Sequence, residues 1–192
     1  MTAVEILRYV SEQVYPLPEE CQADLAKHCQ VISKERGETL VQAGQHSTKI
    51  FFIAQGAARA YFLKDGRDVS DWFAFEGEFI SSIQSYFTDV PSPHYIETLE
   101  PSLLIAIDRE PLQQLADKYR AIDRLEKKVV VVTMLKLQHR IASMQYETAQ
   151  QKYESLLLAI PHLDQRVPLT HIASYLGITL ETLSRVRGKK GA

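Results

Sequence analysis

The stretch LTHIASYLGITLETLSRV, residues 169–186, decides how the C-terminal part of this chain folds. Ile172, Ala173 and Leu176 recur at helical spacing, which predicts one apolar face of a short helix. Gly177 stands where that helix must end, since glycine accepts the left-handed backbone that terminates many helices. The first half of the stretch is therefore predicted to be a helix closed by a tight turn.

The second half of the stretch predicts another short helix, set at a steep angle to the first. Thr179 can cap this helix through its hydroxyl, and Ile178 fills the corner between the two helices. Leu183 and Val186, three residues apart, supply its buried stripe. This pattern is typical of a helix-turn-helix, whose second helix lies in the DNA major groove. The alternative is a two-helix corner in an unrelated helical domain, but agreement at seven positions favours DNA binding.

The charge of the chain is distributed unevenly. The whole sequence has a net charge of −2, whereas residues 163–192 hold five basic and two acidic residues, a net charge of +3. The remaining residues therefore carry a net charge of −5. A small basic segment on an acidic body suits a sensor joined to a DNA-binding part. A solvated, lysine-rich end of the chain would give the same imbalance.

The two cysteines, Cys21 and Cys29, are too few for a disulfide scaffold or for an iron–sulfur cluster held by four thiolates. We expect both to be reduced, and we expect no haem or iron–sulfur cofactor. Glu5 and Arg8 interrupt the first apolar residues, which argues against a secretory signal. No apolar run approaches the ~18 residues that span a bilayer. The sequence thus predicts a soluble, cytoplasmic protein without a membrane partner.

Residues 31–108 have the pattern of an antiparallel β domain. They follow two predicted helices in the first ~30 residues. Short apolar or alternating runs are separated by glycines at intervals of 7 to 12 residues: Gly37, Gly44, Gly56, Gly66 and Gly77. Such even spacing is typical of sandwiches and barrels, and the pair Asp65-Gly66 is a strong hairpin signal. We therefore expect a closed antiparallel roll of about eight strands.

A long helix is predicted after a short amphipathic helix that begins at Arg109. Residues 121–148 contain no Pro or Gly. Four apolar residues recur there in a heptad-like seam: Ile122, Leu125, Val129 and Val132. The seam predicts a dimerisation helix and hence a homodimer, with an intramolecular helix in a monomer as the competing interpretation. A further helix is predicted over residues 149–160.

The order of roll, long helix and helix-turn-helix resembles the Crp–Fnr family of bacterial transcription regulators, whose sensor is a cyclic-nucleotide-binding-like domain. The string ETLSR, from Glu181 to Arg185, matches the family's E-x-x-S-R signature, and Gly77-Glu78 lies in the predicted roll. The resemblance implies an α+β fold that begins with an antiparallel β-roll, a double-stranded β-helix. The implied parts are a sensor roll with flanking helices over residues 1–118, a dimerisation helix over 119–148, and a winged-helix-like helix-turn-helix over 149–192.

The resemblance also implies which residues meet DNA. Glu181 and Arg185 would contact base edges, because a carboxylate accepts from cytosine N4 and a guanidinium binds guanine O6 and N7. A surface ion pair between these two residues is the alternative, and it is compatible with DNA contact. Neighbouring polar and basic residues would meet phosphates. The expected DNA-contacting residues are Thr170, His171, Thr179, Glu181, Thr182, Ser184, Arg185, Arg187, Lys189 and Lys190.

The expected effector site departs from the family pattern. Cyclic-nucleotide binders of the family hold the ribose with the Gly-Glu glutamate and the cyclic phosphate with a downstream arginine. Here Ser92 and Pro93 stand where that arginine and its neighbour should be, and residues 77–99 contain no Arg or Lys. Because a buried phosphate needs a paired cation or several N–H donors, we expect cAMP not to be the effector. The candidate effector-binding residues are Gly77, Glu78, Phe79, Ile80, Ser92 and His94.

The expected function is that of a dimeric DNA-binding regulator that couples an effector-sensing roll to a helix-turn-helix. Expected partners are a palindromic DNA operator, a second copy of the chain, an unidentified small-molecule effector and RNA polymerase. The sequence stops soon after Val186, so we expect the family's two-stranded wing to be absent or truncated to a basic tail. The alternative is a ligand-binding or partner-regulating module of the same fold that has lost DNA binding. We expect neither enzymatic activity nor a metal site, because His46 and His94 lack metal-ligand spacing.

Overall fold

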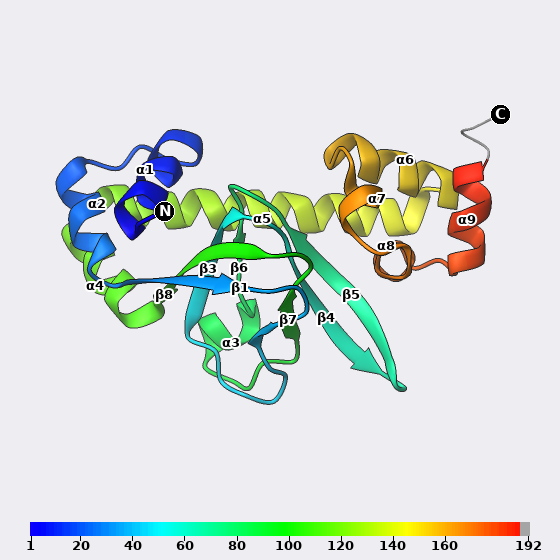
Figure 1. Cartoon of the computed structure of the whole chain (residues 1–192), viewed down its shortest axis with the longest axis horizontal. Coiled ribbons are helices and arrows are strands. Elements are labelled where there is room, and N and C mark those ends of the chain that lie inside the picture. The colour runs from blue at the N-terminus through cyan, green and yellow to red at the C-terminus, as the bar shows by residue number, and fades with distance from the viewer. Residues whose placement is uncertain (189–192) are drawn as a thin grey trace. The chain divides into compact units, whose positions relative to one another are not determined.

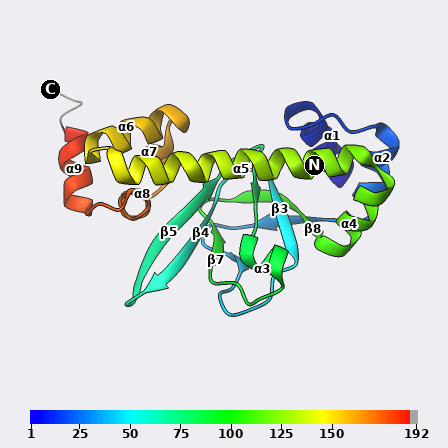
Figure 2. The ribbon, with the colours of Figure 1, turned by 180° about the vertical axis from the view of Figure 1, so that it is seen from behind.

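The computed structural model describes residues 1–188, and its internal contacts divide the chain into two compact units. The first unit is Met1–Ala60 with Phe73–Val131, and the second is Tyr61–Trp72 with Val132–Ala192. Figures 1 and 2 show the ribbon from opposite sides. The second unit thus combines a hairpin from the middle of the sequence with the C-terminal helices. The boundaries expected after residues 118 and 148 stay a prediction.

Two helices open the first unit, as the sequence predicts. α1 (Ala3–Gln13) is capped by Thr2, whose hydroxyl accepts from the Glu5 amide while the Glu5 carboxylate accepts from the Thr2 amide. α2 (Glu19–Ala26) begins directly after Pro18, a residue that suits a helix start because it offers no amide donor.

Eight strands follow within the described residues, which confirms the predicted roll. They form two four-stranded sheets with the orders β1-β8-β3-β6 and β2-β7-β4-β5. β1 and β8 pair antiparallel along their whole length, with Cys29 opposite Ile107 and Lys34 opposite Ser102. The strands are β1 (Cys29–Lys34), β2 (Thr39–Val41), β3 (Lys49–Gln55), β4 (Ala58–Lys64), β5 (Arg67–Ala74), β6 (Phe79–Ile80), β7 (Tyr95–Thr98) and β8 (Ser102–Asp108), with α3 (Ile83–Thr88) between β6 and β7.

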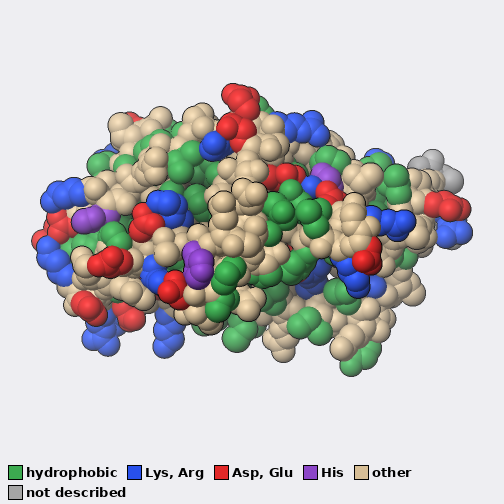
Figure 3. All heavy atoms as spheres, turned by 90° about the horizontal axis from the view of Figure 1, so that it is seen from below, with side chains coloured by type: hydrophobic (Ala, Val, Ile, Leu, Met, Phe, Trp, Pro, Cys, Tyr) green, Lys and Arg blue, Asp and Glu red, His purple; other side chains and the backbone are tan. Residues whose placement is uncertain are grey.

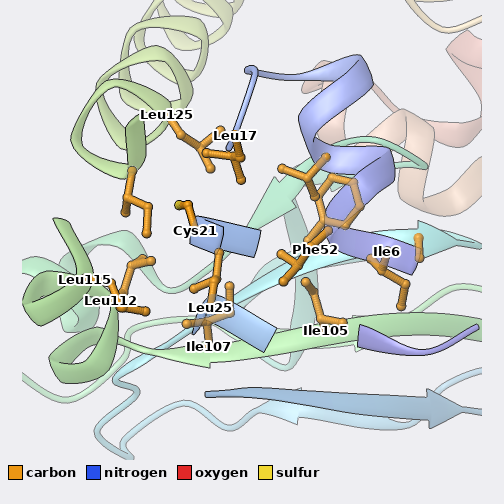
Figure 4. Close-up of a cluster of buried hydrophobic side chains, with 14 residues drawn as sticks. Ile6, Leu17, Cys21, Leu25, Phe52, Ile105, Ile107, Leu112, Leu115 and Leu125 are labelled. Atoms are coloured by element: carbon orange, nitrogen blue, oxygen red, sulfur yellow. The ribbon is translucent and has the colours of Figure 1, made fainter. Parts of the chain in front are cut away.

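The main core of the first unit lies between the β1–β8–β3 sheet and the helices (Figure 4). Phe52 of β3 and Ile105 of β8 are fully buried beside Ile6 of α1. α4 (Arg109–Lys118) closes the other end of this core. Burying a side chain of this size stabilises the fold by roughly 1.5–3 kcal/mol. The buried members are Ile6, Leu7, Val10, Leu17, Cys21, Leu25, Phe52, Ala54, Ile105, Ile107, Leu112, Leu115, Ile122 and Leu125.

The two cysteines are free thiols, as expected. Cys21 is fully buried in this core, and burial raises its pKa. Burial also raises the pKa of the Cys29 thiol, to about 12. Both thiols are therefore protonated and unreactive at neutral pH.

A buried ion pair crosses the second sheet of the roll. The Nε–H of Arg59 in β4 donates to Oε1 of Glu97 in β7 at 2.8 Å, and only 4% of the Arg59 side chain is exposed. Arg59 lies between Ala58 and Ala60, both buried. Removing one partner of such a pair leaves the other charge uncompensated in a poorly hydrated site. Arg59 is a buried cation that the sequence analysis did not identify, because its only local signal is one charged residue within an apolar strand.

The C-terminal half of the chain is helical, as predicted. α5 (Arg120–Tyr146) is one continuous helix, in agreement with the absence of Pro and Gly from this segment. It is followed by α6 (Ala149–Ala159), α7 (Leu163–Arg166), α8 (Leu169–Leu176) and α9 (Leu180–Gly188). Among the described residues, every helix is too short or too polar to cross a bilayer.

Arg59→Met should lower the free energy of unfolding by about 3 kcal/mol, because Glu97 would lose its buried cation. The double variant Arg59→Met/Glu97→Leu should recover most of this loss, since it removes both charges. Urea denaturation of the two variants and the parent protein measures the difference. If the single and double variants lost the same free energy of unfolding, packing at residue 59, and not the charge of Glu97, would determine the loss.

Candidate nucleic-acid interface

The turn between α8 and α9 has the geometry that the sequence predicts. Gly177 ends α8 with φ +66°, in the left-handed region where a side chain would be strained. The Gly177 amide donates to the Ser174 carbonyl at 3.1 Å, and the Ile178 amide donates to the Ala173 carbonyl at 3.0 Å. These bonds satisfy the last carbonyls of α8 and turn the chain sharply toward α9.

Thr179 caps the second helix. Its hydroxyl oxygen accepts from the Thr182 amide at 3.1 Å, as predicted for an N-cap residue. The two threonine hydroxyls also lie 2.9 Å apart and share a hydrogen bond. Thr179 and Thr182 thus have a structural role at the start of α9, in addition to the DNA contact expected of them.

The two helices share a compact core with α6 and α7. Ile172 and Leu183 are fully buried, and Ala173 and Leu176 are 3% and 5% exposed. Val186 is only half-buried, so it contributes less to the predicted stripe than Leu183 does. The neighbouring helices and their connections add Tyr153, Leu156, Leu163 and Val167 to the buried set.

The outer face of α9 presents polar side chains to solvent. Glu181, Ser184 and Arg185 are exposed, and Thr170 is exposed at the start of α8. Neither Glu181 nor Arg185 has a hydrogen bond or an ion pair with any described residue, so the surface pair considered as the alternative is not formed. Their charged groups are therefore available to a ligand. DNA contact at these positions stays a prediction.

Arg187 and the last lysines differ from that pair. Nη2 of Arg187 lies 3.4 Å from Oδ2 of Asp164, and the same carboxylate oxygen accepts from the Tyr153 hydroxyl at 3.0 Å. Arg187 therefore holds α9 to α7 as well as being exposed. Lys189 and Lys190, also expected to meet phosphate, lie outside the described residues.

His171 is engaged by the β4–β5 hairpin. Its Nδ1 lies 3.9 Å from Oδ2 of Asp68, and only 19% of its side chain is exposed. One turn further along α8, the Ser174 hydroxyl accepts from the Ser70 amide at 2.9 Å and donates to the Asp68 carbonyl at 3.2 Å. The imidazole of His171 thus faces a carboxylate of the hairpin, and the phosphate contact expected of this residue stays a prediction.

Arg140 of α5 fixes this arrangement. Its Nη1 donates to both the carbonyl and the carboxylate of Asp71, each at 2.7 Å. Its Nη2 donates to the carbonyls of Ser70 at 3.3 Å and Tyr175 at 3.4 Å, and the guanidinium lies 4.4 Å from the centroid of the Tyr175 ring. One side chain thus bonds to both the hairpin and α8. Sequence reasoning missed it, because its partners are 35 to 70 residues away.

The residues expected to bind an effector have structural roles in the first unit. Gly77 has φ +83°, and its amide donates to the Ile53 carbonyl at 2.9 Å. The Glu78 carboxylate accepts from the Phe75 amide at 3.2 Å. Phe79 pairs with Phe52 across β6 and β3, with the ring centroids 4.9 Å apart, and Ile80 is buried.

Ser92 and His94 are joined by two hydrogen bonds within one loop. The Ser92 hydroxyl accepts from the His94 amide at 3.1 Å and donates to the His94 carbonyl at 2.8 Å. Ser92 is 2% exposed, so its hydroxyl is committed to the loop. Effector binding by these residues stays a prediction.

Two other buried hydroxyls near β6 have no hydrogen-bond partner among the described residues. They belong to Ser82 and Tyr86, which are 0% and 3% exposed. Burial, with a smaller contribution from the Glu126 carboxylate, raises the pKa of Tyr86 to about 12. Burial likewise raises the pKa of Glu126, with a smaller contribution from Asp123. Sequence reasoning did not single out these groups, because serine and tyrosine carry no spacing signal.

The α5 seam predicted for dimerisation is divided between two environments. Ile122 and Leu125 are buried in the core of the first unit, and Val129 packs against that core. Val132 is 42% exposed. The exposed apolar side chains of α5 begin only after Val129: Val130, Val131, Val132, Met134, Leu135, Ile141, Met144 and Tyr146.

Parts of this sequence are similar to known proteins. The family model for the cyclic nucleotide-binding domain matches residues 31–119, which include all eight strands except the first two residues of β1. The "Anaerobic regulatory protein" of Aggregatibacter actinomycetemcomitans is 21% identical over 168 residues. That alignment covers 81% of this chain and 64% of the relative, so this chain spans somewhat less than two thirds of the relative's length.

Solved structures share the fold over most of the chain. FixK2 from Bradyrhizobium japonicum has a TM-score of 0.67 at 22% identity, over 84% of this chain and 83% of FixK2. A protein from Eubacterium rectale, described as a transcriptional regulator of the Crp/Fnr family, has a TM-score of 0.69 at 15% identity, over 88% of this chain and 82% of its own. The roll therefore matches the cyclic nucleotide-binding domain, and most of the chain shares its fold with a solved regulator of the Crp/Fnr family. The E-x-x-S-R string of this chain lies on the exposed side of α9.

The contact between the β4–β5 hairpin and α8 depends on Arg140. Arg140→Ala should release the hairpin and expose the only tryptophan, Trp72, which lies 5.8 Å from Nζ of Lys136. We expect a red shift of the tryptophan emission and at least tenfold faster hydrogen exchange at the Ser70 amide, since about 1.4 kcal/mol of local stability corresponds to a factor of ten. Arg124→Ala, which removes an exposed arginine from the same helix, is the control. Unchanged exchange at Ser70 would contradict the role of Arg140.

Proposed function

We propose that this chain is a dimeric transcription regulator that reads DNA with α9 and senses an effector with its roll. The observation that carries the proposal is the position of Glu181 and Arg185: both lie on the exposed face of a capped second helix that follows a tight turn, and neither has a partner among residues 1–188. These side chains suit cytosine and guanine edges in the major groove.

Dimerisation is part of the proposal, because a palindromic site needs two recognition helices about 34 Å apart. The exposed valine, leucine, isoleucine and methionine side chains on the second half of α5 support it. Apolar side chains exposed along a helix are stabilised when a parallel copy of the helix covers them. We place the seam after Val129, because Ile122 and Leu125 are already buried within the chain.

The effector is proposed to be a small molecule other than cAMP. Arg59 is a buried cation of the roll, but its guanidinium is paired with Glu97, which leaves its charge compensated. The buried hydroxyls of Ser82 and Tyr86 favour a ligand that forms neutral hydrogen bonds in this region. A cytoplasmic location and a contact with RNA polymerase fit a regulator of this kind. Among the described residues there is no cluster of three or more potential metal ligands.

Arg185→Ala should lose sequence discrimination while the dimer stays intact. A preferred site is first selected from random duplexes, and gel shifts then compare it with a scrambled duplex. Loss of one bidentate arginine–guanine contact should reduce the preference by about 10- to 100-fold, or roughly 1–3 kcal/mol. Arg124→Ala, far from α9 in sequence, should keep the preference.

Two results would contradict the proposal. Unchanged discrimination by Arg185→Ala would show that α9 does not read the major groove. A monomeric mass in light scattering of the parent protein would contradict the proposed dimer.

Titration calorimetry with cAMP should give no binding in the micromolar range, because the buried cation of the roll, Arg59, is already paired with Glu97 and residues 77–99 contain no Arg or Lys for the cyclic phosphate. The control is the same titration of Arg59→Met/Glu97→Leu, which should also show no binding. Micromolar binding of cAMP to the parent protein would contradict the proposed class of effector.

A further inference from the structure

We propose that Arg187 is a positioning residue for α9 and not a phosphate contact, and that it acts through Asp164 and the buried Tyr153. This inference rests on the proposed DNA-binding function, and it gives a different role to one of the residues expected to meet phosphate. The three side chains form a chain of polar contacts that holds α9 to α6 and α7. This chain of contacts fixes the helix whose exposed face is proposed to read base edges.

Arg187 lies on the side of α9 that faces the core of the helix-turn-helix. At about 100° per residue, Arg187 is about 240° around the helix axis from Glu181, and the fully buried Leu183 is about 200° from Glu181. Arg185 is only about 40° from Glu181, on the exposed side. Residues four apart share a helix face, so Arg187 follows Leu183, whereas Arg185 follows Glu181. The two arginines of α9 therefore belong to different faces.

Asp164 is the partner that Arg187 meets on this face. Nη2 of Arg187 lies 3.4 Å from Oδ2 of Asp164 in α7, and the Asp164 side chain is 23% exposed. The same oxygen accepts from the hydroxyl of Tyr153 in α6 at 3.0 Å. Tyr153 is 2% exposed, and both burial and the hydrogen bond to Asp164 raise its pKa, so its hydroxyl stays protonated as a donor. One carboxylate thus joins α9 to α6 as well as to α7.

The pairing with Asp164 disfavours a phosphate contact by Arg187. A DNA phosphate that approached Arg187 would also approach the Asp164 carboxylate, and like charges repel. The hydrogen bond from buried Tyr153 holds this carboxylate in place. On the face that Figure 3 shows, basic and acidic side chains are interspersed over the surface. Exposure of an arginine in this chain is therefore not by itself evidence of DNA contact.

The link to Asp164 restrains the last turn of α9. The first turn is fixed by the Thr179 cap, and the middle of the helix by the buried Leu183. Arg187 lies in the last turn and connects it to α7. The bidentate contact proposed for Arg185 is directional, so it requires a fixed orientation of this part of the helix. Arg187 thereby supports base reading without touching DNA.

The test compares Arg187→Gln with the parent protein in two DNA measurements. Fluorescence anisotropy on a labelled duplex of mixed sequence, between about 50 and 200 mM salt, gives the slope of log K against log salt. Loss of a phosphate contact would reduce the magnitude of this slope by about 0.9 per protomer, whereas we expect no change. Competition between the selected site and a scrambled duplex gives the sequence preference. This preference should fall roughly two- to fivefold, the range of a partly exposed ion pair.

Asp164→Asn tests the same link from its other side. Asparagine keeps an oxygen that can accept from Tyr153 but loses the charge that attracts Arg187, so the preference should fall by a similar factor. The double variant Asp164→Asn/Arg187→Gln should lose no more than either single variant, because both changes break one link. A steeper slope and tighter binding of the mixed-sequence duplex by Asp164→Asn would show that Asp164 holds a phosphate ligand away from DNA. That result would overturn the inference.

Three controls separate the link from general effects of charge. Arg187→Lys should recover most of the preference, because it keeps a cation for Asp164. Arg67→Gln removes an exposed arginine at the start of β5, in the same unit, and should change neither slope nor preference. Glu154→Gln removes a carboxylate of α6 that accepts from Gln150, and it measures how the loss of one negative charge alone changes the slope. Far-ultraviolet circular dichroism and the melting temperature show that the variants are folded.

The outcomes separate the inference from the function on which it rests. If the parent protein binds the duplex and prefers its selected site, a shallower slope or an unchanged preference in Arg187→Gln shows that the inference is wrong, while the proposed function stands. If the parent protein binds no duplex at about 50 mM salt, or binds without preference, the proposed function fails and the inference fails with it.

Discussion

A guanidinium that leaves water must replace its hydration with hydrogen bonds, and Arg140 does so with carbonyl groups from two distant segments. Asp71 and Ser70 belong to the hairpin, and Tyr175 belongs to the first helix of the helix-turn-helix. The Nε–H of Arg140 is buried without a partner among the described residues, so the other contacts must outweigh that cost. Together with the Ser174 hydroxyl, this one side chain joins the hairpin to α8.

The helix-turn-helix was predictable because its determinants are local. Gly177 and Thr179 act on their immediate neighbours, and the turn and cap that they form confirm the prediction. The roll was predictable as a set of strands, because glycine turns and alternating residues also act locally. Its division into two sheets follows from pairings such as Cys29 with Ile107, which lie far apart in sequence and leave no periodic signal.

The features that could not be predicted from the sequence are those that depend on contacts between distant segments. The period of Ile122 and Leu125 is the same whether a helix packs on its own chain or on a second copy, so the spacing could not reveal that both are buried within the first unit. His171 was assigned to phosphate from its place in the motif, whereas Asp68 reaches it from 103 residues earlier. Arg59 is likewise paired with a residue 38 positions away. In each case the partner, and not the residue type, determines the role.

The hydrogen bond from Ser70 to Ser174 spans 104 residues, which gives the second unit an order of assembly. During synthesis the hairpin leaves the ribosome long before α8 exists. At about 5–20 residues per second, the hairpin waits roughly 5–20 s for its partner helix. The first unit contains its own core and can form in that interval, apart from the last turns of α5 that belong to it. The helix-turn-helix is therefore the last part to become ordered, and a chain truncated before α8 would carry the hairpin without the helix that it contacts.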